Sequence, residues 1–173
     1  MHWLRYLRAP VAFLALSLFP SVLTARSTRD AVDDWYRCIH KPAWNPPPWL
    51  FGPVWTALYI LIAIAGTLLW RRRDDRGARL ALTLWGVQMA LNHAWSPIFF
   101  GWRRLGLAAV EVSTLWASIL ATVAAARRVS VVAAAMLLPY LAWVTFAAAL
   151  NLRVWALNRG GSSDASDAAR HAT

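Results

Sequence analysis

The sequence predicts an all-α integral membrane protein, built as a bundle of five transmembrane helices. Of its 173 residues, 59% are hydrophobic and 15% are charged, whereas a soluble domain carries about 25% charged residues. The apolar stretches approach the roughly 20 residues that a helix needs to cross a bilayer. The arginines gather in short blocks at the ends of those stretches, where they can meet anionic headgroups. These three observations define the class.

Five apolar segments are the expected membrane helices. They cover approximately residues 10–25, 50–70, 78–97, 105–126 and 129–155. Short polar connectors separate the last four segments, which favours antiparallel neighbours in one bundle. We therefore expect a single transmembrane domain over residues 1–159, followed by a disordered tail over 160–173 that is rich in Gly, Ser, Asp and Ala.

The first segment permits two interpretations. Two arginines, an apolar run and the small residue Ala25 also describe a secretory signal peptide. We favour a retained helix, because the other four segments would otherwise lose one wall of the bundle. N-terminal sequencing of the purified protein distinguishes the two, since a chain that starts at Arg26 has lost the segment.

The net charge of +10 raises the possibility of nucleic-acid binding. Because the arginines sit at the ends of apolar runs, we expect a lipid bilayer as the partner and no nucleic acid. Cys38 is the only cysteine, so no intrachain disulfide can form. The sequence contains no zinc-ligand spacing, no glycine-rich phosphate loop and no convincing Ser/His/Asp set, so it predicts neither a metal site nor a conventional enzyme.

Twelve tryptophans stand out in a chain of this length. An aromatic belt at the membrane interface explains those at segment ends, which are Trp3, Trp70, Trp102 and Trp155. Trp55, Trp95 and Trp143 lie inside segments instead. Each has polar or aromatic company at helical spacing, such as Tyr59 beside Trp55 and Phe146 beside Trp143. These tryptophans are therefore candidates for lining the bundle interior.

Polar side chains within the segments are expected to face the interior, because lipid cannot satisfy them. They are Gln88, Asn92, Glu111 and Asn151. Glu111 can pair with Arg103 or Arg104 across one helical turn, and we favour this structural role over proton handling. His93 is the only histidine inside a predicted helix. It more readily hydrogen-bonds a neighbouring helix than ligates haem, for which it is a weak candidate.

The connector over residues 26–49 is the most distinctive region. Four prolines follow Lys41, and proline fixes φ and removes an N–H donor. We expect a stiff, extended loop without helix. Two roles stay open: a lid over the mouth of the bundle, or a structural loop packed at the interface.

Several motifs then point to one family. They are Trp35-Tyr36, Lys41-Pro42, Trp44-Asn45-Pro46-Pro47, Phe51-Gly52-Pro53-Val54-Trp55, Leu58-Tyr59, Leu91-Asn92-His93-Ala94-Trp95-Ser96-Pro97-Ile98-Phe99-Phe100, Pro139-Tyr140-Leu141-Ala142-Trp143 and Leu150-Asn151. This pattern resembles the translocator protein family, also called tryptophan-rich sensory proteins or peripheral-type benzodiazepine receptors. The motifs occur in order between residues 35 and 155, a stretch that spans the last four segments.

The resemblance implies a five-helix bundle, often a homodimer, that binds porphyrins such as protoporphyrin IX. In members whose pocket has been described, the residues matching Trp55 and Trp143 face the bound ring. The predicted ligand-binding set is Trp35, Trp44, Trp55, Tyr59, Asn92, Trp95, Trp143, Phe146, Ala147 and Asn151. No cofactor is required, and the porphyrin, protoporphyrin IX or haem, enters as ligand.

Three functions follow from the resemblance and the residues. The leading one is a porphyrin-binding membrane protein in tetrapyrrole sensing, transport or stress regulation. The alternative is a light-dependent porphyrin-degrading enzyme in which Trp55 and Trp143 react, and the third is a structural or assembly partner. Seventeen arginines stand against one lysine. This preference suggests the GC-rich coding of a bacterium, and we expect a multi-pass protein of a bacterial cell membrane.

The sequence differs from the family pattern at two places, and it carries a repeat of small residues in the fourth segment. The stretch 149–155 lacks the Tyr of the family's cholesterol pattern, so sterol binding is not carried over. His93 stands where a Trp is common in relatives. Small residues recur every four positions at Ser113, Ala117, Ala121 and Ala125. Such a stripe permits close helix contact, either inside the bundle or at a dimer seam.

Overall fold

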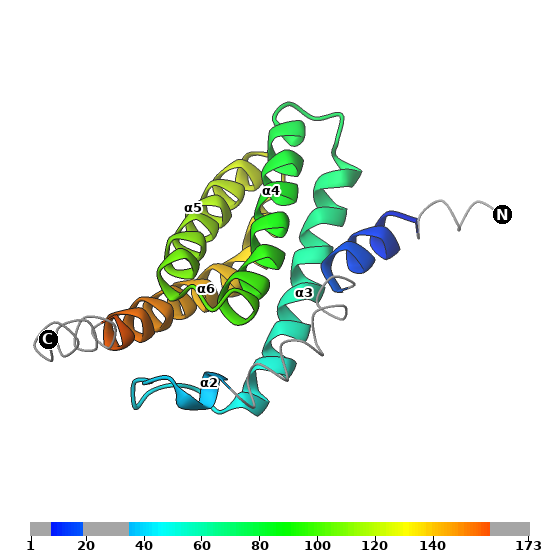
Figure 1. Cartoon of the computed structure of the whole chain (residues 1–173). Coiled ribbons are helices and arrows are strands. Elements are labelled where there is room, and N and C mark those ends of the chain that lie inside the picture. Colours follow the sequence, from blue (N-terminus) through cyan, green and yellow to red (C-terminus); the bar gives the residue numbers. More distant parts are fainter. Residues whose placement is uncertain (1–7, 19–34, 160–173) are drawn as a thin grey trace, which may run out of the picture.

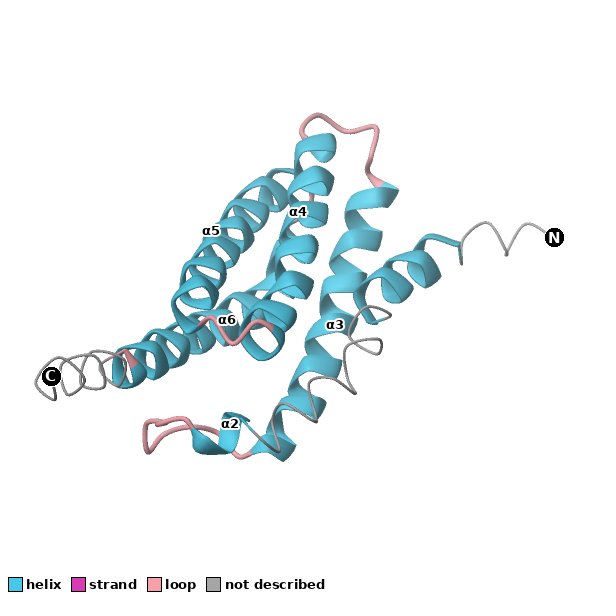
Figure 2. Ribbon diagram, in the orientation of Figure 1, coloured by secondary structure: helices cyan, strands magenta, loops and turns pink. Residues whose placement is uncertain are grey.

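The computed structural model describes residues 8–18 and 35–159, and there it is all-helical, without strands (Figure 2). Its elements in chain order are the helix Arg8–Leu18, α2 (Trp35–Cys38), α3 (Pro48–Arg71), α4 (Ala78–Ser96), the π-helix η1 (Pro97–Gly101), α5 (Leu105–Val129) and α6 (Val131–Asn158) (Figure 1). The all-α class is confirmed.

Among the described helices, α3, α5 and α6 are long and apolar enough to cross a membrane. The helix α4 lies where a fourth span is expected, but Arg79 and its interior polar residues make it less apolar. The described part of the first segment is a shorter apolar helix, Arg8–Leu18. The predicted count of five membrane helices is therefore not confirmed, since the described residues form six α-helices and three clear spans.

The helix boundaries follow local chemistry. Pro48 begins α3, where a missing N–H costs nothing. Gly77 adopts a φ of +87° just before α4, a left-handed conformation that favours glycine. Ser130 is extended and its Oγ accepts a hydrogen bond from the Ala133 N–H, so it caps α6. Val129 still ends α5, so the last helix begins at Val131, two residues after its predicted start near residue 129.

The four long helices pack as an open ring. The helix α5 packs against both α4 and α6, and α6 also packs against α3, whereas α3 and α4 touch less. The helix Arg8–Leu18 lies beside α3 (Figure 1). Its Phe13 ring contacts Trp70 of α3 at 6.4 Å and Trp85 of α4 at 4.8 Å between centroids. The described part of the first segment thus packs on the bundle mainly through Phe13. Removal of this segment as a signal peptide stays an open alternative.

The connector differs from its prediction. Residues Trp35–Cys38 form a helical turn, and Pro48 and Trp49 belong to α3. The prolines lie after this turn, so they do not prevent it. We call residues 35–47, the turn and the proline-rich loop after it, the strap. The predicted connector residues 26–34 and the predicted tail 160–173 lie outside the described residues.

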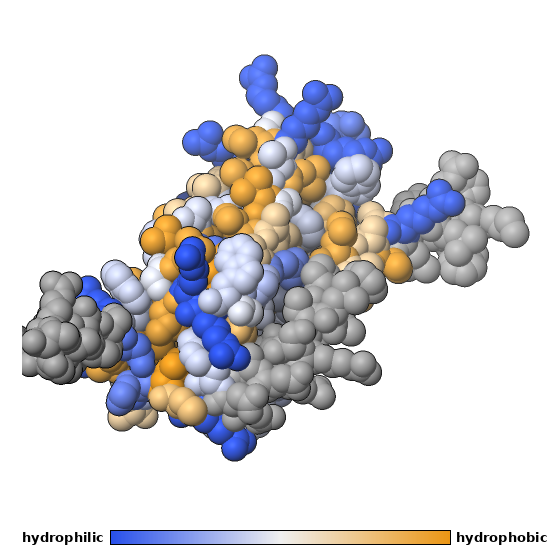
Figure 3. Space-filling view, viewed as in Figure 1, coloured by the Kyte–Doolittle hydropathy of each residue, from blue (hydrophilic) through white to orange (hydrophobic). Residues whose placement is uncertain are grey.

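The surface has the zoning of a membrane protein. Large apolar side chains are exposed along the middle of the helices, among them Ile60, Ile64, Val87, Val110, Leu120 and Leu138. Hydrophilic residues gather at the end of the bundle formed by the α3–α4 connector (Figure 3), which carries Arg72, Arg73 and Arg76. Lipid can therefore surround the middle of the bundle.

Candidate ligand-binding site

A chain of buried hydrogen bonds joins three helices at the centre of the bundle. The Tyr59 hydroxyl of α3 donates to Asn92 Oδ1 of α4 at 2.9 Å. The Asn92 Nδ2 group donates to the Tyr140 hydroxyl of α6 at 3.0 Å. All three side chains are buried. The predicted site residues Tyr59 and Asn92 thus bond to each other directly, and Asn92 also bonds Tyr140, which is not in the predicted site set.

Aromatic rings surround this polar chain. The Trp55 ring lies 5.3 Å from Tyr59 and 6.2 Å from Tyr140. The His93 ring stacks on Tyr59 at 5.8 Å. The expected proximity of Trp55 and Tyr59 is confirmed. His93 Nε2 is buried without a hydrogen-bond partner among the described residues, and haem ligation by His93 stays a prediction.

A second aromatic group links α6 to α3 and to the strap. Trp143 and Phe146 are 5.5 Å apart on α6, as their spacing predicts. Phe51 of α3 contacts Trp143 at 6.0 Å, and Trp44 of the strap contacts Phe146 at 5.6 Å. Phe51 was not in the predicted set, although it begins the motif that contains Trp55.

A third group fixes α2 on the π-helix. Trp95 stacks on Phe99 at 4.9 Å, and Trp35 and Tyr36 contact Phe99 at 5.7 and 6.1 Å. The π-helix after Pro97 brings Phe99 under α2, where it is 3% exposed. Trp35 and Trp95 therefore share one cluster around Phe99, and Trp95 also packs against the main core that contains Tyr59.

Hydrogen bonds hold the strap on the end of the bundle. The His40 N–H donates to Asn158 Oδ1 at 3.0 Å, and Asn158 Nδ2 donates to the His40 carbonyl at 2.9 Å. Within the strap, Lys41 Nζ donates to the Tyr36 and Ile39 carbonyls at 2.6 and 2.9 Å. The Tyr36 hydroxyl donates to Asn45 Oδ1 at 2.8 Å, and burial raises the pKa of this phenol.

One face of α6 offers polar groups that the described residues leave unused. Trp143, Ala147 and Asn151 lie four residues apart and hence on the same side of the helix. Trp143 Nε1 and both amide atoms of Asn151 are buried without a hydrogen-bond partner in the described structure. Trp95 Nε1 on α4 is in the same state. Buried donors of this kind are normally satisfied, so they mark a place for a polar ligand atom or water.

Glu111 does not behave as predicted. Its two carboxylate oxygens have no hydrogen-bond partner in the part of the chain that the structure describes. Arg103 and Arg104 precede the first residue of α5 and are exposed, and the Arg103 guanidinium lies 5.9 Å from the Trp35 ring instead. Glu111 faces inward two turns further on, so the expected ion pair does not form.

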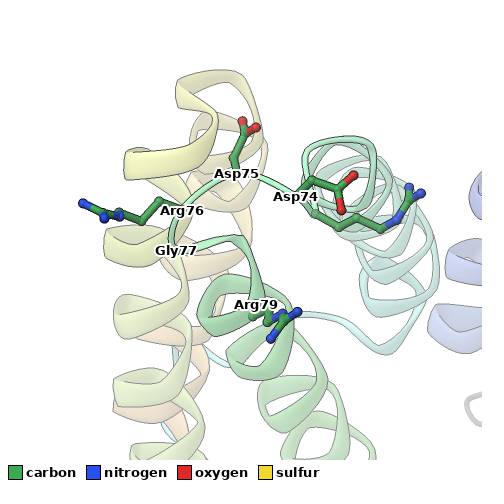
Figure 4. Close-up of a pocket in the computed structure, with 6 residues that line it drawn as sticks. Asp74, Asp75, Arg76, Gly77 and Arg79 are labelled. Carbon is green, nitrogen blue, oxygen red and sulfur yellow. The ribbon is translucent and has the colours of Figure 1, made fainter.

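Two surface depressions lie away from these clusters. One, of about 330 Å³, is formed by the charged α3–α4 connector. Figure 4 shows its Arg76 and Arg79 leaving the chain in different directions. The other, of about 620 Å³, is an apolar groove whose lining includes Gly106, Ser113, Ala117 and Trp155. Two of the four residues of the predicted small-residue stripe, Ser113 and Ala117, therefore face outward along this groove. No residue of the predicted ligand set lines either depression.

Apolar helices around an interior rich in tryptophan and buried polar groups define a multi-pass helical membrane protein. The chain belongs to the TspO/MBR family, whose model matches residues 11–156. It is similar to the translocator protein of Ovis aries (42% identity over 131 residues, 75% of this chain and 78% of the relative). It is also similar to protein CrtK of Rhodobacter capsulatus (42% over 127 residues, 73% and 79%). The tryptophan-rich protein TspO of Archaeoglobus fulgidus is 36% identical over 158 residues, 91% of this chain and 99% of the relative. The resemblance read from the motifs is confirmed.

Proposed function

We propose that this protein binds a porphyrin-type tetrapyrrole inside a five-helix membrane bundle, with the strap as its lid. The five helices are the first segment and α3 to α6. The observation that carries the proposal is the α6 face of Trp143, Ala147 and Asn151, beside the rings of Phe51, Phe146 and Trp44. A porphyrin is planar and apolar, so aromatic rings suit its faces. Its pyrrole nitrogens and carboxylates need hydrogen-bond partners, which the indole N–H and the amide supply.

The biological role we propose is tetrapyrrole sensing, transport or stress regulation. Relatives that carry the names translocator protein and tryptophan-rich sensory protein support a role of this kind. We place the protein in the cell membrane of a bacterium, as a homodimer. The small-residue groove between α5 and α6 is one face on which a second copy could pack.

The test is a titration of the purified protein with protoporphyrin IX, followed by tryptophan fluorescence. We expect saturable quenching. Trp143→Phe removes an N–H donor and part of a stacked ring, which together contribute about 1–2 kcal/mol, so its affinity falls roughly fivefold to thirtyfold. Trp70→Phe is the matched control, because Trp70 is exposed at the far end of α3. Unchanged emission from a protein with intact helical circular dichroism would refute the proposal.

A second candidate is light-dependent degradation of the bound porphyrin. It needs an indole beside the bound ring, and we assign this part to Trp143, whose N–H is buried without a hydrogen-bond partner among the described residues. The double variant Trp55→Phe/Trp143→Phe would then bind porphyrin but form no product under light. Equal loss of porphyrin absorbance with and without the protein rules this activity out.

A further inference from the structure

One end of the bundle carries a cationic surface that is assembled from two segments far apart in the sequence. The Arg72 guanidinium donates a hydrogen bond to the Val129 carbonyl at 2.5 Å, across 57 positions of the chain. Gly77 lies at the same junction, because a Cβ atom added there would meet the Val129 side chain at 4.0 Å. The α3–α4 connector and the last turn of α5 are therefore held together as one surface.

Seven arginines and two aspartates lie in the two segments of this surface, residues 71–79 and 127–131. Arg72 is engaged with Val129, and Arg73 Nη1 donates to the Trp70 carbonyl at 3.4 Å. The other five arginine side chains are exposed, and no hydrogen bond or ion pair joins them to the described residues. They are Arg71, Arg76, Arg79, Arg127 and Arg128. The surface thus holds unused guanidinium groups.

The cations at the opposite end of the bundle are mostly engaged with the protein itself. Lys41 donates to two carbonyls of the strap. The Arg103 guanidinium lies 5.9 Å from the centre of the Trp35 ring. The Arg159 guanidinium lies 5.2 Å from the centre of the Trp155 ring, and an aromatic face attracts such a cation. Among the described residues, the unused positive charge is therefore concentrated at the α3–α4 end.

Exposed apolar side chains border the unused arginines. Trp70 precedes Arg71 and Leu80 follows Arg79, and both apolar side chains are exposed. Val131, which begins α6 beside the last turn of α5, is exposed as well. In a membrane, apolar side chains of this kind lie among the acyl chains or at the interface. The arginines next to them therefore lie at the depth of the headgroups, where phosphodiester groups are the available anions.

The geometry of the surface suits several headgroups better than one small anion. A guanidinium can pair with two phosphate oxygens at once, which matches arginine to a phosphodiester. Arg76 and Arg79 leave the chain in different directions, so they do not close on a single ion (Figure 4). The depression at the connector, of about 330 Å³, is lined by charged side chains and Gly77 and offers no apolar chamber to a soluble ligand.

We infer that the α3–α4 connector and the end of α5 form a binding surface for anionic phospholipids. The headgroup phosphates lie among the five unused arginines, and the acyl chains run along Leu80 and Val131. The bond between Arg72 and Val129 joins the two halves of this surface. The surface is separate from the proposed porphyrin site and does not depend on it. The protein should consequently prefer an anionic phospholipid to a zwitterionic one with the same chains.

The test is native mass spectrometry of the full-length protein, released from micelles that contain equal amounts of phosphatidylglycerol and phosphatidylcholine with the same chains. We expect more protein bound to phosphatidylglycerol, and a smaller excess at higher ionic strength, because exposed charges are screened. Arg76→Gln/Arg79→Gln/Arg128→Gln should lower the ratio of the two complexes by about fivefold or more, since one arginine beside an anionic membrane surface has roughly that effect. Equal binding of the two lipids by the wild type overturns the proposal.

The matched control is Arg104→Gln/Arg153→Gln/Arg159→Gln, which removes the same charge from exposed side chains at the opposite end. This variant should leave the lipid ratio nearly unchanged, and an equal loss in both triple variants would show that net charge alone decides, against a defined surface. Inorganic phosphate should not displace the lipid, and displacement would assign the arginines to a soluble anion and overturn the lipid as occupant. Circular dichroism checks the helix content. If either triple variant unfolds, the single variants Arg128→Gln and Arg104→Gln replace the two triples, with the same opposite expectations.

Discussion

The contact between Phe13 and Gly66 provides a direct test of the first helix. A Cβ atom added at Gly66 would lie 2.5 Å from Phe13 Cδ1 and 3.0 Å from Trp85 Cε2. Ordinary van der Waals contact begins at 3.4 Å, so the Phe13 ring would have to retreat by 0.9 Å, the difference between 3.4 and 2.5 Å. Gly66→Ala therefore forces the helix Arg8–Leu18 away from α3.

Two opposing effects decide the sign of Gly66→Ala. Alanine is favoured over glycine in a helix by about 1 kcal/mol. Overpacking of a filled interior costs about 1–3 kcal/mol. Because the nearest atoms belong to a ring between two helices, we expect the clash to prevail, with a net loss of up to about 2 kcal/mol. If the first segment is removed as a signal peptide, the Phe13 ring is absent and only the Trp85 contact at 3.0 Å remains, so the loss should be smaller.

The assay is a double-mutant cycle with Phe13→Ala, measured by reversible denaturation in mixed micelles. In the Phe13→Ala background the Phe13 ring is gone and only Trp85 Cε2, at 3.0 Å, stays close to the added Cβ. Gly66→Ala should therefore cost less there, with a coupling of about 1–3 kcal/mol. N-terminal sequencing of each sample controls for processing. Equal effects of Gly66→Ala in both backgrounds, with the segment present, would refute the placement of this helix.

Three further predictions concern the polar contacts. Asn92→Leu removes the hydrogen bonds that Asn92 makes with the Tyr59 and Tyr140 hydroxyls, which lowers the free energy of unfolding by about 1–4 kcal/mol, given the modest strength of hydrogen bonds in membranes. Tyr59→Phe/Tyr140→Phe in the same background should recover part of this loss, as measured by denaturation. Asn158→Ala removes both bonds to His40, so protease cleavage within the strap should quicken about threefold to tenfold, whereas Arg159→Ala should leave it unchanged. Because burial raises the pKa of Tyr36 above its ordinary 10.0, its contribution to strap closure is complete below that pH and is lost as the pH rises through the folded-state value. Proteolysis should therefore quicken at high pH in the wild type but not in Tyr36→Phe, and equal pH profiles would contradict this.

The sequence predicts contacts along one helix well and contacts between helices poorly. Trp55 with Tyr59 and Trp143 with Phe146 follow from helical spacing alone, and both contacts form. Hydropathy places the long helices to within a few residues. The periodicity does not say which faces meet, so Tyr140 could not be identified as the partner of Asn92. The bonds between Asn158 and His40 join positions 118 residues apart, and no local pattern predicts them.

The predictions that the structure contradicts concern the places where helices begin, end or change pitch. The pairing of Glu111 with Arg103 or Arg104 assumed that the arginines share its helix, but α5 begins at Leu105. The helical turn at Trp35–Cys38 was missed because the prolines after it dominate the composition of the connector. The π-helix at Pro97–Gly101 places Phe99 beneath Trp35. The sequence does not distinguish a π-helix from an α-helix at these residues, so this placement could not be predicted.

The position of Asn158 has a mechanical consequence. It lies seven residues after Asn151 on α6, about 10.5 Å along the axis and close to two full turns, so both amides project from the same side of one helix. Asn151 faces the interior without a partner in the described structure, while Asn158 clasps the strap. The helix α6 thus carries both the interior amide of Asn151 and the amide of Asn158 that bonds the strap. A rotation of α6 that turns Asn151 must also pull on the bonds between Asn158 and His40, so the position of the strap and the orientation of the interior face of α6 are mechanically linked.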